Sequence, residues 1–179
     1  LKTIHQRDNP FSDIIMGNIE IDSFKLENGI VINTRIIKPY NYNDSIAYPL
    51  LLYVYNGPNV QLIENDFLAS SSLWMHYLAN QGYIILTIDG RGSENRGLDF
   101  EQIIFRNLGE IEMKDQIRGL QNFISKENVD KNRIAVYGWS YGGYMATNLL
   151  CTYPDFFSCG VAGGPVIDWK YYEVMYTER

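Results

Sequence analysis

One serine lies in a sequence pattern that is typical of a nucleophile. Residues 138–143 read Gly-Trp-Ser-Tyr-Gly-Gly, which places Ser140 in the pattern Gly-x-Ser-x-Gly. A short β-branched, apolar run precedes it and a plausible helix start follows, and this order is what a nucleophile elbow requires. Glycines in the pattern remove side chains that would collide with backbone in so tight a turn. The pattern predicts that Ser140 stands exposed above a sheet at the positive end of a helix. The alternative is a glycine-rich turn with an incidental serine.

A serine nucleophile also needs a base within hydrogen-bond reach and a carboxylate that orients this base. The sequence has two histidines, His5 and His76, and both precede Ser140. In α/β-hydrolases the order along the chain is serine, acid, histidine, and the carboxylates after Ser140 follow it too closely for the usual acid position. We expect His76 to be a partly buried helix residue rather than the base. The sequence predicts that the acid and the base lie beyond residue 179, and that the chain alone is catalytically inactive or nearly so.

Length and composition narrow the class of protein. A chain of 179 residues with 46% hydrophobic residues indicates one globular domain with a sizeable core. We expect no membrane span, because no run approaches eighteen apolar residues, and we expect no signal peptide at the start. The net charge of −6 argues against a general nucleic-acid binder. The two cysteines, Cys151 and Cys159, match no zinc-binding spacing.

The elements that must position Ser140 follow from hydrophobic patterning. An alternating run over 19–26 and a β-branched run over 30–37 flank Asn28-Gly29 and predict an antiparallel hairpin. Apolar runs over 48–55, 83–88, 133–137 and 158–162 predict further strands. Residues 1–18 look like a lead-in or linker, and residues 128–133 look like a loop.

Helices are expected between these strands. The helical regions are 73–80, 111–126, 144–153 and 168–179. Strands that alternate with helices imply an α/β fold, with a mostly parallel sheet covered on both faces. The hairpin then adds antiparallel strands at one edge.

Several motifs stand in a recognisable order. They are Tyr48-Pro49-Leu50-Leu51-Leu52, Tyr55-Asn56-Gly57-Pro58, Asp89-Gly90-Arg91-Gly92-Ser93, Asp115-Gln116, the elbow at 138–143 with Tyr144, Trp169-Lys170-Tyr171-Tyr172 and Tyr176-Thr177-Glu178-Arg179. With these motifs the chain resembles the catalytic domain of the prolyl oligopeptidase family of serine peptidases, most closely its dipeptidyl peptidase IV branch. The resemblance runs from about the hairpin to residue 179 and implies the α/β-hydrolase fold.

The resemblance implies a role for three residues. Ser140 would be the acylating nucleophile, and the oxyanion hole would use the backbone N–H of Tyr141 and the phenol of Tyr55. A tyrosine O–H is a workable donor to developing negative charge. It also suits this chain, because Pro58 has no N–H and no Gly-rich loop follows the strand. The alternative for Tyr55 is a buried strand aromatic with its hydroxyl at the rim.

The resemblance also implies an apolar pocket for the substrate residue before the cleaved bond. Its walls would be the Tyr141 ring, Val166, Trp169, Tyr172 and Tyr176. The last three are spaced three and four apart, which puts them on one face if residues 168–179 form a helix. A flat aromatic slot suits a proline ring. Core packing of an amphipathic helix is the alternative.

Other polar residues of the motifs are expected to shape a loop rather than touch substrate. These residues are Asp89, Arg91 and Ser93.

The function implied is a serine exopeptidase that cleaves peptides after proline through an acyl-enzyme. Its substrate is a peptide with a penultimate proline, and no metal, organic cofactor or nucleic acid is implied. An esterase or acylaminoacyl-peptidase on the same fold, and a triad-deficient binding module, are the alternatives. By resemblance, the parent protein would be a homodimer that is secreted, periplasmic or membrane-anchored.

The domain organisation is also an expectation from resemblance. Residues 1–18 would connect to an N-terminal β-propeller, which in the family carries the acidic residues that grip a free amino terminus. Residues 19–179 would be the first part of the peptidase domain, truncated before its last strands. Such a fragment would expose a sheet edge, so we expect it to be marginally stable or to associate with itself. Cys159 matches a cysteine that pairs with a later one in mammalian relatives.

Overall fold

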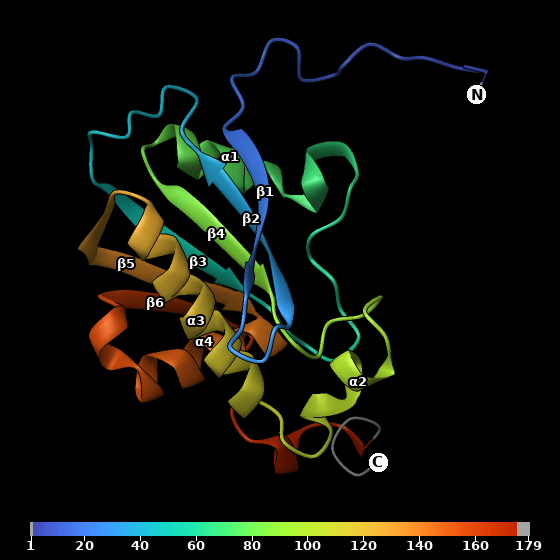
Figure 1. Ribbon diagram of the computed structural model, residues 1–179, viewed down its shortest axis with the longest axis vertical. Helices are drawn as coiled ribbons and strands as arrows, with labels where there is room; N and C mark the ends of the chain where they lie inside the picture. The colour runs from blue at the N-terminus through green and yellow to red at the C-terminus, as the bar shows by residue number, and fades with distance from the viewer. Residues whose placement is uncertain (1, 175–179) are drawn as a thin grey trace.

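The protein is built around one six-stranded sheet. The computed structural model describes residues 2–174 (Figure 1). Along the sheet the strands follow the order β1-β2-β4-β3-β5-β6. The strands are β1 (Asn18–Lys25), β2 (Val31–Lys38), β3 (Tyr48–Val54), β4 (Ile84–Asp89), β5 (Val129–Trp139) and β6 (Cys159–Gly163).

The sheet combines an antiparallel hairpin with a parallel part, as the sequence predicts. β1 pairs with β2 in an antiparallel register that runs from Asn18 opposite Lys38 to Lys25 opposite Val31. The hairpin turn contains Gly29 with φ 84°, a conformation that suits glycine. β2 is also antiparallel to β4, whereas β3 is parallel to both β4 and β5, and β5 is parallel to β6. The carboxyl ends of the parallel strands therefore meet at one edge of the sheet.

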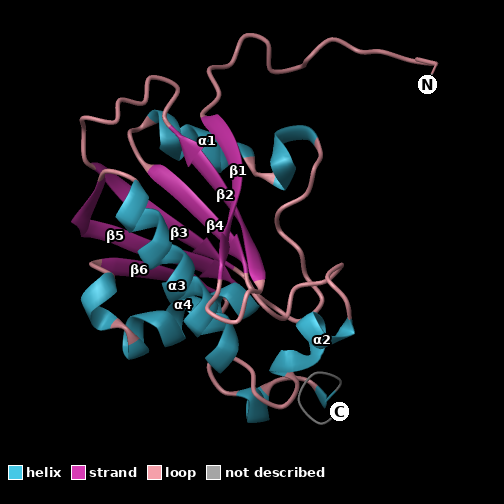
Figure 2. Ribbon diagram, in the orientation of Figure 1, coloured by secondary structure: helices cyan, strands magenta, loops and turns pink. Residues whose placement is uncertain are grey.

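Helices cover both faces of the sheet (Figure 2). The helices are α1 (Leu73–Asn80), α2 (Leu98–Glu101), α3 (Glu110–Lys126) and α4 (Tyr141–Thr152), and the 3-10 turns are η1 (Phe67–Ser70), η2 (Gln102–Ile104), η3 (Pro154–Phe156) and η4 (Trp169–Tyr171). Apolar side chains of α3 and α4 share one core cluster with one face of the sheet. A smaller cluster of Ile37, Met75, Ala79 and Ile85 joins α1 to the other face. None of the helices among residues 2–174 is long and apolar enough to cross a membrane.

The loop expected over residues 128–133 is wrong. Residues 128–133 were expected to be a loop, but β5 begins at Val129, which pairs with Tyr48 before a register shift to Leu50 opposite Ile134. Asp130 accounts for the irregularity, because its carboxylate accepts hydrogen bonds from the Asn132 N–H at 3.0 Å and from Arg133 Nε at 2.6 Å. The polar turn is thus a bulge within the strand.

The helix expected over 168–179 is also wrong in its described part. Over residues 168–173 only the short turn η4 forms, and Tyr172 directly after it is extended, with φ −86° and ψ −179°. The Asp168 carboxylate accepts a hydrogen bond from the Lys170 N–H at 3.1 Å and so favours a capped turn at this point. Trp169 and Tyr172 therefore do not lie on one face of a continuous helix.

Candidate active site

The predicted strand, turn and helix around Ser140 are present. β5 ends at Trp139, α4 begins at Tyr141, and Ser140 between them has φ 58° and ψ −117°. A positive φ is strained for a serine, and such strain occurs where the surrounding structure enforces it. The Ser140 N–H donates a 2.8 Å hydrogen bond to the Gly163 carbonyl at the end of β6. Ser140 is half-buried rather than fully exposed.

The glycines of the elbow are required by close backbone contacts. A Cβ at Gly138 would collide with the Gly142 carbonyl, and a Cβ at Gly142 would collide with the Val54 carbonyl at the end of β3. A Cβ at Gly143 would lie 2.7 Å from the Gly163 carbonyl oxygen. Because the ends of β3 and β6 and the first turn of α4 press on this elbow, only residues without side chains at these positions let Ser140 take its place.

Ser140 opens into a small hollow of about 40 Å³. The described residues that line the hollow are Tyr55, Ser140, Tyr141, Val166, Trp169 and Tyr172. These are the predicted site residues, except Tyr176, which lies outside the described residues. The structure thus brings together residues from three separate segments of the chain.

Aromatic rings form a continuous wall of the hollow. The Tyr141 ring centroid lies 6.1 Å from that of Tyr55 and 5.6 Å from that of Trp169. Trp169 in turn meets Tyr172 edge-on at 6.0 Å. Tertiary contacts between rings, rather than the periodicity of one helix, therefore build this wall.

Tyr55 reaches the hollow from the end of β3. The chain turns sharply after it, because Asn56 has φ 56°. Asn56 is buried, and its Oδ1 accepts a hydrogen bond from Gln116 Nε2 of α3. A Cβ at Gly57 would lie 2.5 Å from the Tyr55 ring, so the glycine leaves room for that ring.

Tyr141 is held from below by a buried carboxylate. Its O–H donates to Glu112 Oε1 of α3 at 2.7 Å, and the other oxygen, Oε2, accepts from the Gly109 N–H at 2.9 Å. Burial raises the pKa of Glu112, while these hydrogen bonds act in the opposite direction. The backbone N–H of Tyr141 belongs to the first residue of α4, where the helix dipole favours negative charge.

His76 does not lie in the hollow. It is 2% exposed on α1, which packs on the sheet face opposite α4. Its Nε2 lies 2.9 Å from Ser71 Oγ, and burial lowers the pKa of the imidazole. The expectation that His76 is a helix residue rather than the base fits this position, although it is fully rather than partly buried. None of the described residues that line the hollow is a histidine.

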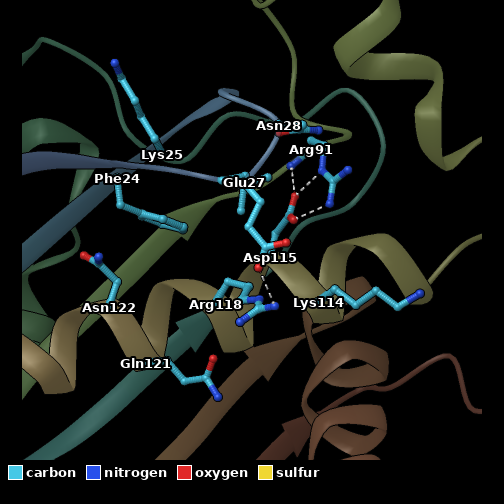
Figure 3. Close-up of a pocket in the computed structure, with 11 residues that line it drawn as sticks. Phe24, Lys25, Glu27, Asn28, Arg91, Lys114, Asp115, Arg118, Gln121 and Asn122 are labelled. Carbon is cyan, nitrogen blue, oxygen red and sulfur yellow. Dashed lines mark hydrogen bonds and ion pairs between the residues drawn. The ribbon is translucent and has the colours of Figure 1, made fainter.

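The polar residues at the end of β4 and in the loop after it hold nearby loops through hydrogen bonds. Asp89 accepts hydrogen bonds from the backbone N–H groups of Leu62 and Ile63. Arg91 donates to Asp115 of α3 from Nη2 at 2.6 Å and from Nε at 2.9 Å (Figure 3). Ser93 Oγ donates to the Gly90 carbonyl at 2.9 Å.

A larger cavity, of about 620 Å³, lies between the hairpin turn and α3 (Figure 3). Charged groups on its walls pair with one another, as Arg91 does with Asp115 and Arg118 does with Glu27 at 3.0 Å. Ser140 is not among its lining residues. We therefore take the small hollow beside the serine as the candidate active site. Among residues 2–174 no group of three or more His, Cys, Asp and Glu side chains is placed to hold a metal ion.

Sequence reasoning missed the polar residues beneath the hollow. The sequence pattern gives Asp115-Gln116 no role and does not single out Glu112. Glu112, Asp115 and Gln116 are all fully buried on α3. A signal was present, because Glu112 and Gln116 precede Leu120 at spacings of four, which puts polar residues on the apolar face of the helix.

Comparisons with known proteins agree with this site. The model of the prolyl oligopeptidase family matches residues 69–179. Human (Homo sapiens) dipeptidyl peptidase 8 is 39% identical over 161 residues, which cover 89% of this chain and 18% of the relative. Mouse (Mus musculus) prolyl endopeptidase FAP is 36% identical over 173 residues, which cover 96% of this chain and 22% of the relative. The chain thus spans about a fifth of the length of these curated relatives.

A solved structure matches the whole fold. The crystal structure of a protein described as a dipeptidyl aminopeptidase IV from Bacteroides ovatus superposes with a TM-score of 0.92 at 46% identity. The match covers 96% of this chain and 24% of that one. It confirms the expected α/β-hydrolase fold with an antiparallel hairpin at the sheet edge. The chain belongs to the prolyl oligopeptidase family of serine peptidases.

Proposed function

We propose that the full-length protein cleaves peptides after proline through an acyl-enzyme on Ser140. One observation carries the proposal: the hollow joins Ser140 to Tyr55, Tyr141 and the aromatic wall. The positive φ of Ser140, at 58°, supports a nucleophile held ready at the start of a helix. The names of the relatives, dipeptidyl peptidase 8 and prolyl endopeptidase FAP, support the substrate class.

The proposed reaction begins with attack of Ser140 Oγ on the carbonyl carbon of the scissile bond. A base takes the hydroxyl proton as the C–O bond forms, and the carbonyl oxygen becomes an oxyanion. The Tyr141 N–H and the Tyr55 O–H donate to this oxyanion. Collapse of the intermediate breaks the C–N bond, the leaving amine takes the proton, and water then hydrolyses the acyl-enzyme.

The reaction also needs a base and a carboxylate that orients it. In α/β-hydrolases both groups follow the nucleophile in the chain, and His76 packs on the other face of the sheet. The chain covers about a fifth of its relatives' length. We therefore propose that both groups belong to the full-length protein outside these 179 residues. On the same grounds we propose that residues 1–18 connect to another domain and that residues 19–179 are part of the peptidase domain.

The preference for proline is proposed from the shape and chemistry of the wall. Val166, Trp169 and Tyr172 offer apolar and aromatic surfaces beside the serine. A proline ring is compact and apolar and has no backbone N–H to leave unsatisfied. The penultimate proline of a peptide thus fits this slot better than a polar residue does.

The test is hydrolysis by the full-length protein of a chromogenic Gly-Pro amide, with Ser140→Ala as the comparison. We expect kcat/KM to fall by at least roughly 10³-fold in the variant, because the nucleophile is lost. Activity that survives this substitution would contradict the proposal. The same amide with a blocked amino terminus separates dipeptide release from internal cleavage, and a chromogenic acetyl ester tests for an esterase.

A further inference from the structure

Helix α3 buries polar side chains directly beneath the candidate site. Glu112 and Gln116 lie one helical turn apart and are both fully buried. α3 runs alongside α4 on the same face of the sheet (Figure 1). Burying a polar group costs free energy unless hydrogen bonds compensate for it. The hydrogen-bond partners of Glu112 and Gln116 therefore indicate which parts of the site these residues hold in place.

Glu112 acts on the residue that follows the nucleophile. It accepts the Tyr141 O–H at 2.7 Å, and the Gly109 N–H at 2.9 Å fixes the carboxylate itself. The Tyr141 ring is only 2% exposed, so this hydrogen bond forms in a dry environment where it is strong. A fixed ring fixes the orientation of the residue whose backbone N–H is the proposed donor to the oxyanion.

Gln116 holds Asn56, the residue after Tyr55, which is the other proposed donor to the oxyanion. Its Nε2 donates to Asn56 Oδ1 and, at 2.9 Å, to the Ile88 carbonyl of β4. Asn56 has φ 56°, a left-handed conformation that costs energy outside glycine, although asparagine tolerates it best. The hydrogen bond holds this strained turn in place, and the turn directs Tyr55 toward the hollow.

We infer that Glu112 and Gln116 are positioning residues that set the two oxyanion donors relative to Ser140. This inference rests on the proposed function. Each residue bonds to the turn that carries one donor, and both emanate from one rigid helix. Donors aimed in advance at developing charge stabilise the transition state more than the bound substrate. Loss of either positioning residue therefore lowers kcat more than it changes KM.

Two substitutions test the inference with little change of shape. Glu112→Gln replaces one acceptor oxygen by a donor group, so that it no longer matches both the Tyr141 O–H and the Gly109 N–H. Gln116→Met is similar in volume and removes both donated hydrogen bonds. We expect kcat per titrated active site to fall about 10-fold in each, since complete loss of one donor costs on the order of 10²–10³-fold. KM on the Gly-Pro amide should change less than about twofold.

Leu120→Ala is the matched control. Leu120 is fully buried on the same helix, one turn beyond Gln116, and belongs to the apolar core. Its truncation lowers the unfolding temperature but leaves kcat per active site unchanged. A peptide boronate, whose adduct resembles the tetrahedral intermediate, adds a second measurement. We expect its affinity to fall in parallel with kcat for the two polar variants and to stay constant for Leu120→Ala.

A double-mutant cycle tests whether Glu112 affects kcat through its hydrogen bond with Tyr141. Tyr141→Phe removes the O–H that Glu112 accepts, so the Glu112→Gln and Tyr141→Phe effects on kcat should not add. Fully additive effects, or wild-type kcat in Glu112→Gln and Gln116→Met with only a lower unfolding temperature, would overturn the positioning role. If Ser140→Ala is inactive at the same time, the proposed function still stands. Activity that persists in Ser140→Ala would overturn both.

Discussion

At the scale of single residues, the site depends on the elbow glycines, which have no side chains, as much as on Ser140. Ser140 keeps a φ of 58° although such a conformation costs of order 1–3 kcal/mol. The backbone around it leaves no alternative, because Gly138, Gly142 and Gly143 each lie against a carbonyl of a neighbouring segment. The strain at the serine is therefore enforced by packing at the glycines.

Gly142→Ala tests this dependence. The added methyl group would collide with the Val54 carbonyl, which is backbone and cannot rotate away. We expect a loss of more than about 2 kcal/mol in the free energy of unfolding, measured by urea denaturation. Gly29→Ala is the control, since a Cβ there meets open space and pays only for its positive φ, about 1–2 kcal/mol. Equal losses in the two variants would show that the contact with β3 does not constrain the elbow.

At the scale of elements, the sequence predicts regular strands and helices better than segments whose structure is decided by contacts with distant residues. The hairpin, the buried strands and the helices α1, α3 and α4 follow from alternation and from helical spacing. Over residues 168–172 a capped turn replaces the expected helix, because Asp168 caps η4 and the Trp169 ring packs against Tyr141 and Tyr144 of α4. The apolar spacing there serves this tertiary contact rather than one helical face. The same limit applies to the site. Ser140 and its glycines are neighbours in the sequence. The roles of Glu112 and Gln116, by contrast, depend on their contacts with Tyr141 and Asn56, which lie far away in the sequence.

The segment between β3 and α1 is another element that the sequence does not reveal. Leu68, Ala69 and Ser70 all have positive φ, which makes a left-handed turn without glycine. Arg35, buried in β2, holds this segment by donating to the Leu62 carbonyl at 2.8 Å and the Ala69 carbonyl at 2.5 Å. A charged side chain inside the fold thus stabilises a strained loop.

Arg35→Leu is expected to release this loop. The buried Ala69 carbonyl and the part-buried Leu62 carbonyl lose their donor and Asp89 loses its nearby cation, so the free energy of unfolding should fall by about 3 kcal/mol. Limited proteolysis should then cut first between residues 59 and 72. Arg118→Leu is the control, because its exposed pair with Glu27 is worth less than about 1 kcal/mol. A cleavage pattern identical to that of Arg118→Leu would contradict the role of Arg35.

At the scale of the whole molecule, the two edge strands of the sheet differ in their charge and exposure. Charged residues of the edge strand β1 form ion pairs, as Asp22 does with Lys126 and Glu20 does with Lys38. β6 at the opposite edge pairs only with β5 among the described strands, and Val161 within it is 62% exposed. Trp139 nearby is 60% exposed. An apolar edge strand of this kind is a template for pairing with another chain.

The 179-residue chain produced alone should therefore associate with itself through β6. We expect light scattering to report a mass above the 20.7 kDa of one chain, rising with concentration. Val161→Lys places a charge on the exposed side of the edge strand and should shift the population toward the monomer. Val174→Lys, at an exposed residue outside the sheet, should leave the mass unchanged. A wild-type chain that is monomeric at every concentration would refute this, as would association that Val161→Lys does not weaken, because the exposed strand would then not be the surface through which copies meet.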